Sequence, residues 1–298
     1  MQAMTSKIIK LTFTSSVHFG NSRLSDSEIS FKSDSFYSAL MIEAVKLGRQ
    51  DEFVKLIKDG QLAISDLLPY RGDSLHLPKP NITHPYNVFT NKSYKSCKYV
   101  PIESLADIVT HNITNEFVPA VFGVHSLIEK VAILDGDNEP YGIGTFTFDE
   151  DCGLYCIVNS SNQAEVLLNK LVASLSFTGI GGKKTSGYGK FSFAYITNSI
   201  MEEALTYTHG RKLLVSTALP KVLNDLEGAR FKLVKRGGFI DSASYAESIV
   251  KKEDMFAFSA GSTFSNVFDG DIFTVGYKGK HPVYRFLIPM FISLRGVE

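Results

Sequence analysis

The chain of 298 residues is 44% hydrophobic and 21% charged, a composition of folded globular proteins that excludes a disordered chain. Its 31 basic and 31 acidic side chains cancel, which excludes a generic, globally basic DNA coat protein but leaves room for a local basic track. No apolar run approaches the ~20 residues of a membrane helix and three cysteines are too few for a disulfide scaffold, so we expect a cytoplasmic protein that does not contact a membrane.

The first predicted elements are a strand and two helices. Residues 7–13 form a short apolar segment typical of a strand, and a turn-rich stretch follows it. Asp34 is a plausible cap for a helix that ends at Gly48, and a second helix follows at 51–60. From Leu68 to about Ile102 the chain is rich in proline and has few periodic apolar positions. We therefore expect a long irregular insertion there.

Regular patterns return at residues 125–134, which we predict to be a strand. Residues 143–160 indicate two strands around the acidic turn Asp149–Asp151. Residues 162–177 have apolar side chains at helical spacing, and a glycine-rich stretch and the predicted strand 190–196 follow directly. This order is close to the β-α-β-β-α-β arrangement of a ferredoxin-like unit. The part of the chain from about residue 206 is richer in strands and is compatible with a second, degenerate copy.

The basic residues are unevenly distributed. Lysine or arginine without any acid occurs in four stretches: residues 1–25, 92–98, 179–190 and 229–240. A short run of this kind is often only a solvated face. Two of these runs adjoin glycine pairs or clusters, however, and this combination favours an anionic ligand.

The glycine-rich stretch GIGGKKTSGYGKF resembles a nucleotide P-loop, but it lies between a helix and a strand. A P-loop leads from a strand into a helix, so neither a P-loop nor a dinucleotide-binding loop fits. Glycines permit positive φ and close approach to a ligand, and exposed N–H groups with lysines and hydroxyls bind anions such as a sugar-phosphate backbone. The alternative is a mobile solvent loop. The candidate RNA-binding residues of this loop are Gly179, Gly181, Gly182, Lys183, Lys184, Thr185, Ser186, Gly187, Tyr188 and Gly189.

Two further turns carry possible donors. Lys235 and Arg236 precede a glycine pair, and Gly261, Ser262 and Thr263 form the other turn. We expect both turns to converge on the same tract as the glycine loop. The aromatic residues Phe19, Tyr188 and Phe264 lie in or beside such turns and could either stack on bases or pack in the core.

Four features together resemble the RAMP superfamily and, more narrowly, the fourth Csm subunit of type III-A CRISPR–Cas effector complexes. They are VHFGNSRL near the start, LPKP at 77–80, the glycine loop, and FAFSAGSTFSNVFDG near the end. Their order and spacing extend over nearly the whole chain. The glycine loop alone would indicate only the superfamily.

The resemblance implies an α+β fold of two tandem ferredoxin-like (RRM-like) domains, residues 1–204 and a degenerate 205–298. It also implies a thumb-like insertion at about 68–120. The implied function is that of a non-catalytic subunit without a cofactor, which caps the complex and holds the 5′ repeat-derived tag of the CRISPR RNA. Its implied partners are the large polymerase-like subunit and the backbone subunit. The glycine loop, His18 and Phe19 would then line the RNA, and Lys79 would lie on the thumb.

Two other functions remain open. A metal-independent RAMP endoribonuclease that processes repeat RNA would use His18 as general acid or base. A pure protein scaffold would use the glycine loop to dock a partner helix. A metal site is not indicated, because Cys152 and Cys156 read as buried thiols and the acidic turn 149–151 reads as a solvated hairpin.

Overall fold

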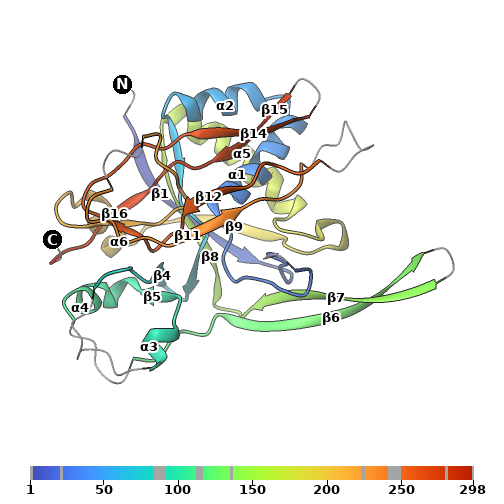
Figure 1. Ribbon diagram of the computed structural model, residues 1–298, viewed down its shortest axis with the longest axis horizontal. Helices are drawn as coiled ribbons and strands as arrows, with labels where there is room; N and C mark the ends of the chain where they lie inside the picture. The colour runs from blue at the N-terminus through green and yellow to red at the C-terminus, as the bar shows by residue number, and fades with distance from the viewer. Residues whose placement is uncertain are drawn as a thin grey trace.

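A computed structural model describes residues 3–20, 23–83, 92–111, 117–134, 137–222, 226–240, 250–278 and 281–296. An antiparallel sheet in the order β5-β4-β3-β8-β1-β9 forms its centre, and β2 pairs with β8 beside this path (Figure 1). The strands of this sheet are β1 (Thr5–Phe13), β2 (Leu62–Ile64), β3 (Leu68–Arg71), β4 (Ser74–Pro78), β5 (Tyr99–Pro101), β8 (Cys152–Ser160) and β9 (Phe191–Ile196).

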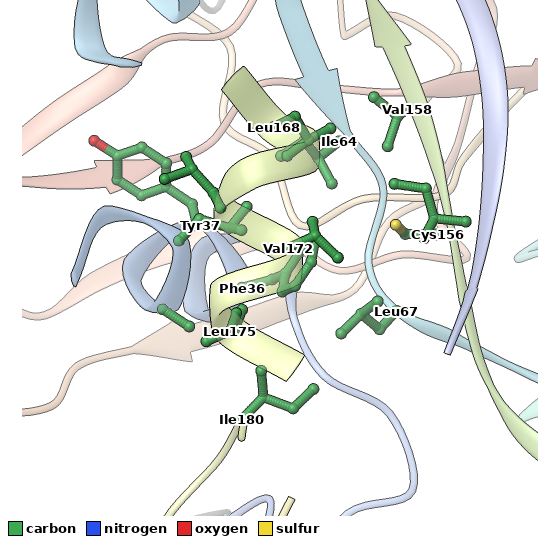
Figure 2. Close-up of a cluster of buried hydrophobic side chains, with 14 of the residues drawn as sticks. Phe36, Tyr37, Ile64, Leu67, Cys156, Val158, Leu168, Val172, Leu175 and Ile180 are labelled. Atoms are coloured by element: carbon green, nitrogen blue, oxygen red, sulfur yellow. The ribbon is translucent and has the colours of Figure 1, made fainter. Parts of the chain in front are cut away.

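One face of this sheet is covered by helices. These are α1 (Ser33–Lys46), α2 (Gln50–Lys58) and α5 (Asn162–Thr178), the last of which confirms the prediction at 162–177. Alternate residues of β8 point to this side, because successive side chains of a strand point to opposite faces. In Figure 2 the α5 side chains Leu168, Val172 and Leu175 lie between those of α1 and those of the sheet.

The other face of the sheet is covered by the C-terminal half of the chain. Tyr155 and Ile157 of β8 share a core with Leu213 and Ile292. This side is built from α6 (Ser199–Thr206) and a small sheet of β13 (Thr263–Phe264), β10 (Lys212–Leu214) and β16 (Phe291–Ser293). Both large cores therefore contain residues from before and after the predicted domain boundary at 204.

Two further hairpins complete the C-terminal half: β11 (Leu233–Arg236) with β12 (Met255–Phe258), and β14 (Ile272–Lys278) with β15 (His281–Phe286). Phe286 of β15 stacks on Tyr37 of α1, with the ring centroids 5.5 Å apart. After α6 the described residues contain no helix. The α+β class is confirmed, but the described part of the second half contributes only strands.

Two parts project from this body (Figure 1). The strands β6 (Gly123–Leu134) and β7 (Asp137–Phe148) form a long antiparallel hairpin. A small lobe beside β4 and β5 contains α3 (Lys92–Ser96), the 3-10 turn η1 (Ile102–Ser104) and α4 (Leu105–Val109). Its core consists of Tyr94, Cys97, Val100 and Ile108.

The predicted irregular region starts too early. Residues 68–78 form β3 and β4, which pair with each other, and β3 pairs with β8. Prolines 69 and 78 and the turn at Gly72 hid the strand pattern, although Leu68, Tyr70, Leu75 and Leu77 are buried. Residues 84–91 and 112–116 of the expected insertion lie outside the described residues.

The predicted cap at Asp34 is also wrong. Lys32 is the N-cap of α1, without a side-chain cap bond, and Asp34 lies in the first helical turn. The helix α5 does have a side-chain cap, since the Ser161 hydroxyl accepts the Ala164 N–H at 3.2 Å. Within the described residues no helix combines the length and the apolar character that crossing a membrane requires.

Candidate nucleic-acid interface

The glycine loop leads from α5 into β9 and contains the 3-10 turn η2 (Lys184–Ser186). Its backbone turns through the left-handed region at φ 58° for Lys183 and at positive φ for four glycines: 179, 181, 187 and 189. At Gly181 a Cβ would lie 2.6 Å from the His18 carbonyl oxygen, and at Gly189 it would lie 2.0 Å from that of Ile180. At these two positions only glycine fits the observed path.

The loop is anchored to the body of the protein. Gly182 N–H donates to the His18 carbonyl at 2.8 Å, and Gly189 N–H donates to that of Ser16 at 2.9 Å. The side chain of Ile180, just beyond the end of α5, is fully buried in the same core as Leu175 (Figure 2). These contacts argue against the alternative of a mobile solvent loop.

Matched alanine substitutions would test how the loop is built. We expect Gly189→Ala to lower the free energy of unfolding by at least about 3 kcal/mol, because left-handed strain adds to overpacking against Ile180. At Gly187 a Cβ meets nothing within 4 Å, so Gly187→Ala adds only strain of about 1–2 kcal/mol. Urea denaturation of the two variants measures this difference. Equal losses would contradict the tight packing of the loop.

The anchored loop presents donors that the described part of the protein does not neutralise. The ammonium of Lys183 lies 5.5 Å from the ring centroid of Tyr141 in β7, and Lys130 of β6 lies 5.9 Å from that of Tyr188. Within the described part of the chain, Lys183, Lys184 and Lys190 have no ion pair. Nor do the N–H groups of Gly181, Lys183 and Lys184 have an acceptor there. Such a row of donors suits an anion.

His18 and Phe19 lie beneath the loop rather than beside a ligand. The His18 side chain is 6% exposed, and its Nδ1–H donates to the Gly144 carbonyl at 2.6 Å. Phe19 is 3% exposed and packs on Phe31 at a centroid distance of 4.8 Å. Burial prevents base stacking on Phe19 and leaves little access to the His18 ring, which disagrees with the expected RNA contacts of both side chains.

The charges of the turn at Lys235 and Arg236 are already compensated. The guanidinium of Arg236 donates to both carboxylate oxygens of Asp34, at 2.8 and 2.9 Å. Burial opposes this charge, but Asp34 prevails and raises the pKa of Arg236. Lys235 pairs with Asp254 at 2.9 Å. The expectation that both donors are available to RNA therefore does not hold for Arg236.

The turn Gly261–Thr263 is hydrogen-bonded to Asn81, which lies beside it in space but far away in the sequence. Asn81 N–H donates to the Gly261 carbonyl at 2.8 Å, and the Thr263 hydroxyl donates to that of Asn81 at 2.7 Å. Ser262, Thr263 and Phe264 are at most 1% exposed. The described contacts give this turn a structural role, and the expected stacking on Phe264 does not fit its burial.

Lys79 does not lie on the projecting hairpin. Its ammonium donates to the carbonyls of Tyr94 and Lys95, both at 2.8 Å, and so binds the end of α3. Burial lowers the pKa of Lys79, and the positive charge of Lys232 lowers it further.

A groove of about 880 Å³ brings together several of the residues that the sequence predicts to bind RNA. It lies between α3 and β5 on one side and β11 on the other, and Phe19, Lys79, Arg236 and Gly261 line it. The glycine loop adjoins the groove through the segment 18–20 but does not line it. The two predicted turns therefore meet at one groove, but the glycine loop only adjoins it. Lys95, Lys98 and Lys232 also line the groove, and two of the acid-free runs signalled them.

Comparison with known proteins decides the family. Residues 208–294 match the model of the CRISPR Csm4 C-terminal domain. Over 303 residues the chain is 35% identical to the CRISPR system Cms protein Csm4 of Mycobacterium tuberculosis, with 98% of each chain covered. The chain belongs to the Csm4 family. Csm4 of Streptococcus thermophilus is 32% identical over 311 residues, covering 98% of this chain and 99% of its own.

Solved structures related to the Csm4 family share this fold. A chain in the crystal structure of the Csm3–Csm4 subcomplex of the type III-A CRISPR–Cas interference complex has a TM-score of 0.68 and 19% identity. The match covers 96% of this chain and 98% of that one. A chain of the Csm1–Csm4 cassette with AMPPNP has a TM-score of 0.64 and 16% identity, covering 99% and 100%. The resemblance inferred from the four sequence features is confirmed.

The thiols of this Csm4-family protein are structural. Cys97, Cys152 and Cys156 are free and buried, as predicted for the last two. Burial raises the pKa of Cys152 and of Cys156 to about 12, so neither forms a thiolate near neutral pH. Among the described residues no group of three or more His, Cys, Asp or Glu side chains could hold a metal.

Proposed function

We propose that this protein is the Csm4 subunit of a type III-A CRISPR–Cas effector complex and holds the 5′ repeat-derived tag of the CRISPR RNA. In this role it caps one end of the complex and contacts both the large polymerase-like subunit Csm1 and the backbone subunit Csm3. Family membership supports this proposal, as do the Csm3–Csm4 and Csm1–Csm4 assemblies in which similar chains occur. The expected cytoplasmic location is part of the same proposal.

The glycine loop is the observation that carries the RNA-binding part. Several backbone N–H groups of the loop have no hydrogen-bond acceptor among the described residues. In the same part of the chain, the side chains of Lys183, Lys184 and Lys190 have no ion pair. A phosphodiester backbone needs such repeated donors and no base-specific contact. Because the loop is anchored, it would bind RNA without an ordering cost of its own.

We also propose the finer fold assignment. The strand order β9-β1-β8-β3, with α1 and α5 packed on one face, supports an embellished ferredoxin-like domain at 1–204. The projecting β6–β7 hairpin is the better candidate for the thumb, since the segment with Lys79 lies against the body. A degenerate second domain at 205–298 remains the proposal for the rest.

A non-catalytic role fits the surroundings of His18. A general acid or base needs access to the proton that it transfers. The His18 ring instead donates a hydrogen bond to the Gly144 carbonyl and lies against Gly20 and Gly182. The alternative of a pure protein scaffold can be distinguished by salt dependence, since its binding would not weaken steeply as the salt concentration rises.

A complex reconstituted with labelled repeat-containing RNA tests this function. We expect the RNA to be retained at constant length and to dissociate steeply as salt rises, because several phosphates are bound. Turnover that His18→Ala abolishes would instead indicate the endoribonuclease. A complex that assembles normally while this chain contacts no RNA would indicate the scaffold.

A further inference from the structure

The projecting hairpin meets the glycine loop through four side chains, two lysines and two tyrosines. Lys130 of β6 and Tyr141 of β7 stand directly opposite each other in the hairpin register, so their side chains share one face. Lys183 and Tyr188 lie on either side of η2 in the loop. The Lys183 ammonium is 5.5 Å from the ring centroid of Tyr141, and the Lys130 ammonium is 5.9 Å from that of Tyr188. The hairpin and the loop thus each supply one cation and one ring, and we call the four side chains the lysine–tyrosine quartet.

In the quartet, aromatic rings take the place that carboxylates have in an ion pair. All four residues are half-buried, and neither Lys130 nor Lys183 has an ion pair among the described residues. The face of a tyrosine ring is negative and attracts an ammonium that lies within about 6 Å of its centroid. Because both distances lie near this limit, each contact is weak, and a stronger acceptor can replace the ring.

Within the described chain, polar and ring contacts attach the hairpin to the body at two places, its base and the quartet. At the base, Val17 and Phe146 exchange two backbone hydrogen bonds, at 2.8 and 2.9 Å, and Gly144 N–H donates to the Leu24 carbonyl at 2.9 Å. Residues 127–143 make no hydrogen bond or ion pair to the rest of the described chain, and their ring contacts to it are the two cation–π pairs. The direction of the outer hairpin relative to the loop therefore depends on the quartet.

A glycine lies between these two places of attachment. Gly142 of β7 directly follows Tyr141 and pairs with the exposed Glu129 of β6. Glycine in the interior of a strand weakens the strand and often marks a bend. A bend at Gly142 would move the outer hairpin while the hydrogen bonds of the base stay intact.

The quartet also uses a lysine that the proposed function assigns to RNA. A charge-assisted hydrogen bond from the Lys183 ammonium to a phosphate oxygen is stronger than a cation–π contact at 5.5 Å. A phosphodiester strand on the loop would therefore draw Lys183 away from Tyr141. This exchange removes one of the two contacts that hold the outer hairpin against the loop.

We propose that the lysine–tyrosine quartet is a latch, which holds the hairpin against the glycine loop while the loop is free and releases it when the RNA backbone takes Lys183. This inference rests on the proposed function and goes beyond it, since it couples occupancy of the loop to the position of the hairpin. The latch also weakens RNA binding slightly. Because the contact must open first, the apparent affinity falls with the fraction of the chain in the open, binding-competent state.

Two substitutions at Tyr141 separate the effect of the ring from that of the rest of the side chain. Tyr141→Leu removes the ring and so opens the latch, whereas Tyr141→Phe keeps the ring and is the matched control. Neither substitution changes the charge, and the Tyr141 hydroxyl has no hydrogen-bond partner among the described residues. Lys130→Gln removes the cation beside Tyr188 and opens the other half of the latch independently.

The distance between spin labels on the hairpin and on α5 reports the state of the latch. The labels are attached at Val131→Cys and Lys170→Cys, both exposed positions, while the native thiols are buried. Double electron–electron resonance on the purified RNA-free chain should give one narrow distance distribution for the unchanged Tyr141 and for Tyr141→Phe. Tyr141→Leu and Lys130→Gln should give a broader, shifted distribution. In the complex reconstituted with repeat-containing RNA all of these distributions should coincide. Tyr141→Leu should also bind this RNA about two- to five-fold more tightly, measured as retention over a salt series.

The outcomes separate this inference from the function on which it depends. Identical distributions for Tyr141→Leu and Tyr141→Phe in the RNA-free chain would overturn the latch and leave the proposed function standing. A difference that persists once RNA is bound would show a permanent brace and would overturn the release. A complex that retains no RNA would overturn the proposed function and the release by RNA with it, while the RNA-free distances alone decide whether the quartet holds the hairpin.

Discussion

Replacing Asp34 by alanine is expected to lower the free energy of unfolding by about 3–5 kcal/mol, the usual cost of removing one partner from a buried ion pair. The Asp34 carboxylate is 5% exposed and accepts two hydrogen bonds from Arg236 and one from Arg285 at 3.3 Å. Without it, the guanidinium of Arg285, whose side chain is 4% exposed, stays buried without a carboxylate partner. Urea denaturation of the purified chain at neutral pH measures the change.

Asp254→Ala is the matched control for this substitution. Asp254 also binds two basic side chains, Lys235 and Lys251, but its carboxylate faces solvent. Exposed pairs contribute little, so the control should change the stability far less than Asp34→Ala does. A similar loss in the two variants would show that burial of the Asp34 cluster does not stabilise the protein. Both substitutions should leave the slope of the free energy of unfolding against urea concentration unchanged, because neither alters the surface that unfolding exposes.

The same aspartate shows what a sequence can and cannot reveal. Asp34 lies at the start of a helical pattern, and local reasoning assigns it a capping role. Its actual partners, Arg236 and Arg285, are 202 and 251 residues away in the chain. Elements with a long uninterrupted period were predictable, as α5 was, because their pattern is local. The strands β3 and β4 were missed, because prolines interrupt a pattern whose burial depends on pairing with β8.

In the candidate site too, features set by contiguous residues were predictable and features set by tertiary packing were not. The glycine loop was predictable because its glycines, lysines and flanking elements are contiguous. The burial of Phe19 and Phe264 was not, since small residues beside an aromatic do not reveal which part of the core will cover it. Nor could the sequence show that Lys79 and Lys232 face one groove, because that depends on how the N-terminal and C-terminal halves pack.

Removing the two central lysines of the glycine loop should have the largest effect on RNA binding. We expect Lys183→Ala/Lys184→Ala to retain markedly less RNA in the assembled complex than the unchanged protein does. Each lysine that binds a phosphate releases counterions, so the slope of log affinity against log salt should fall by roughly one to two. Retention measured over a salt series gives both quantities.

Stability and assembly should be unaffected, which distinguishes a binding effect from misfolding. Neither ammonium has an ion pair among the described residues, and the loop is held by backbone bonds to His18 and Ser16 that alanine leaves in place. Lys170→Ala on α5 removes a comparable exposed charge away from the loop and should leave RNA retention and its salt slope unchanged. If the double variant assembles and retains RNA as well as this control does, the loop does not bind the phosphate backbone. The uncompensated charge around 179–190 must then serve another partner.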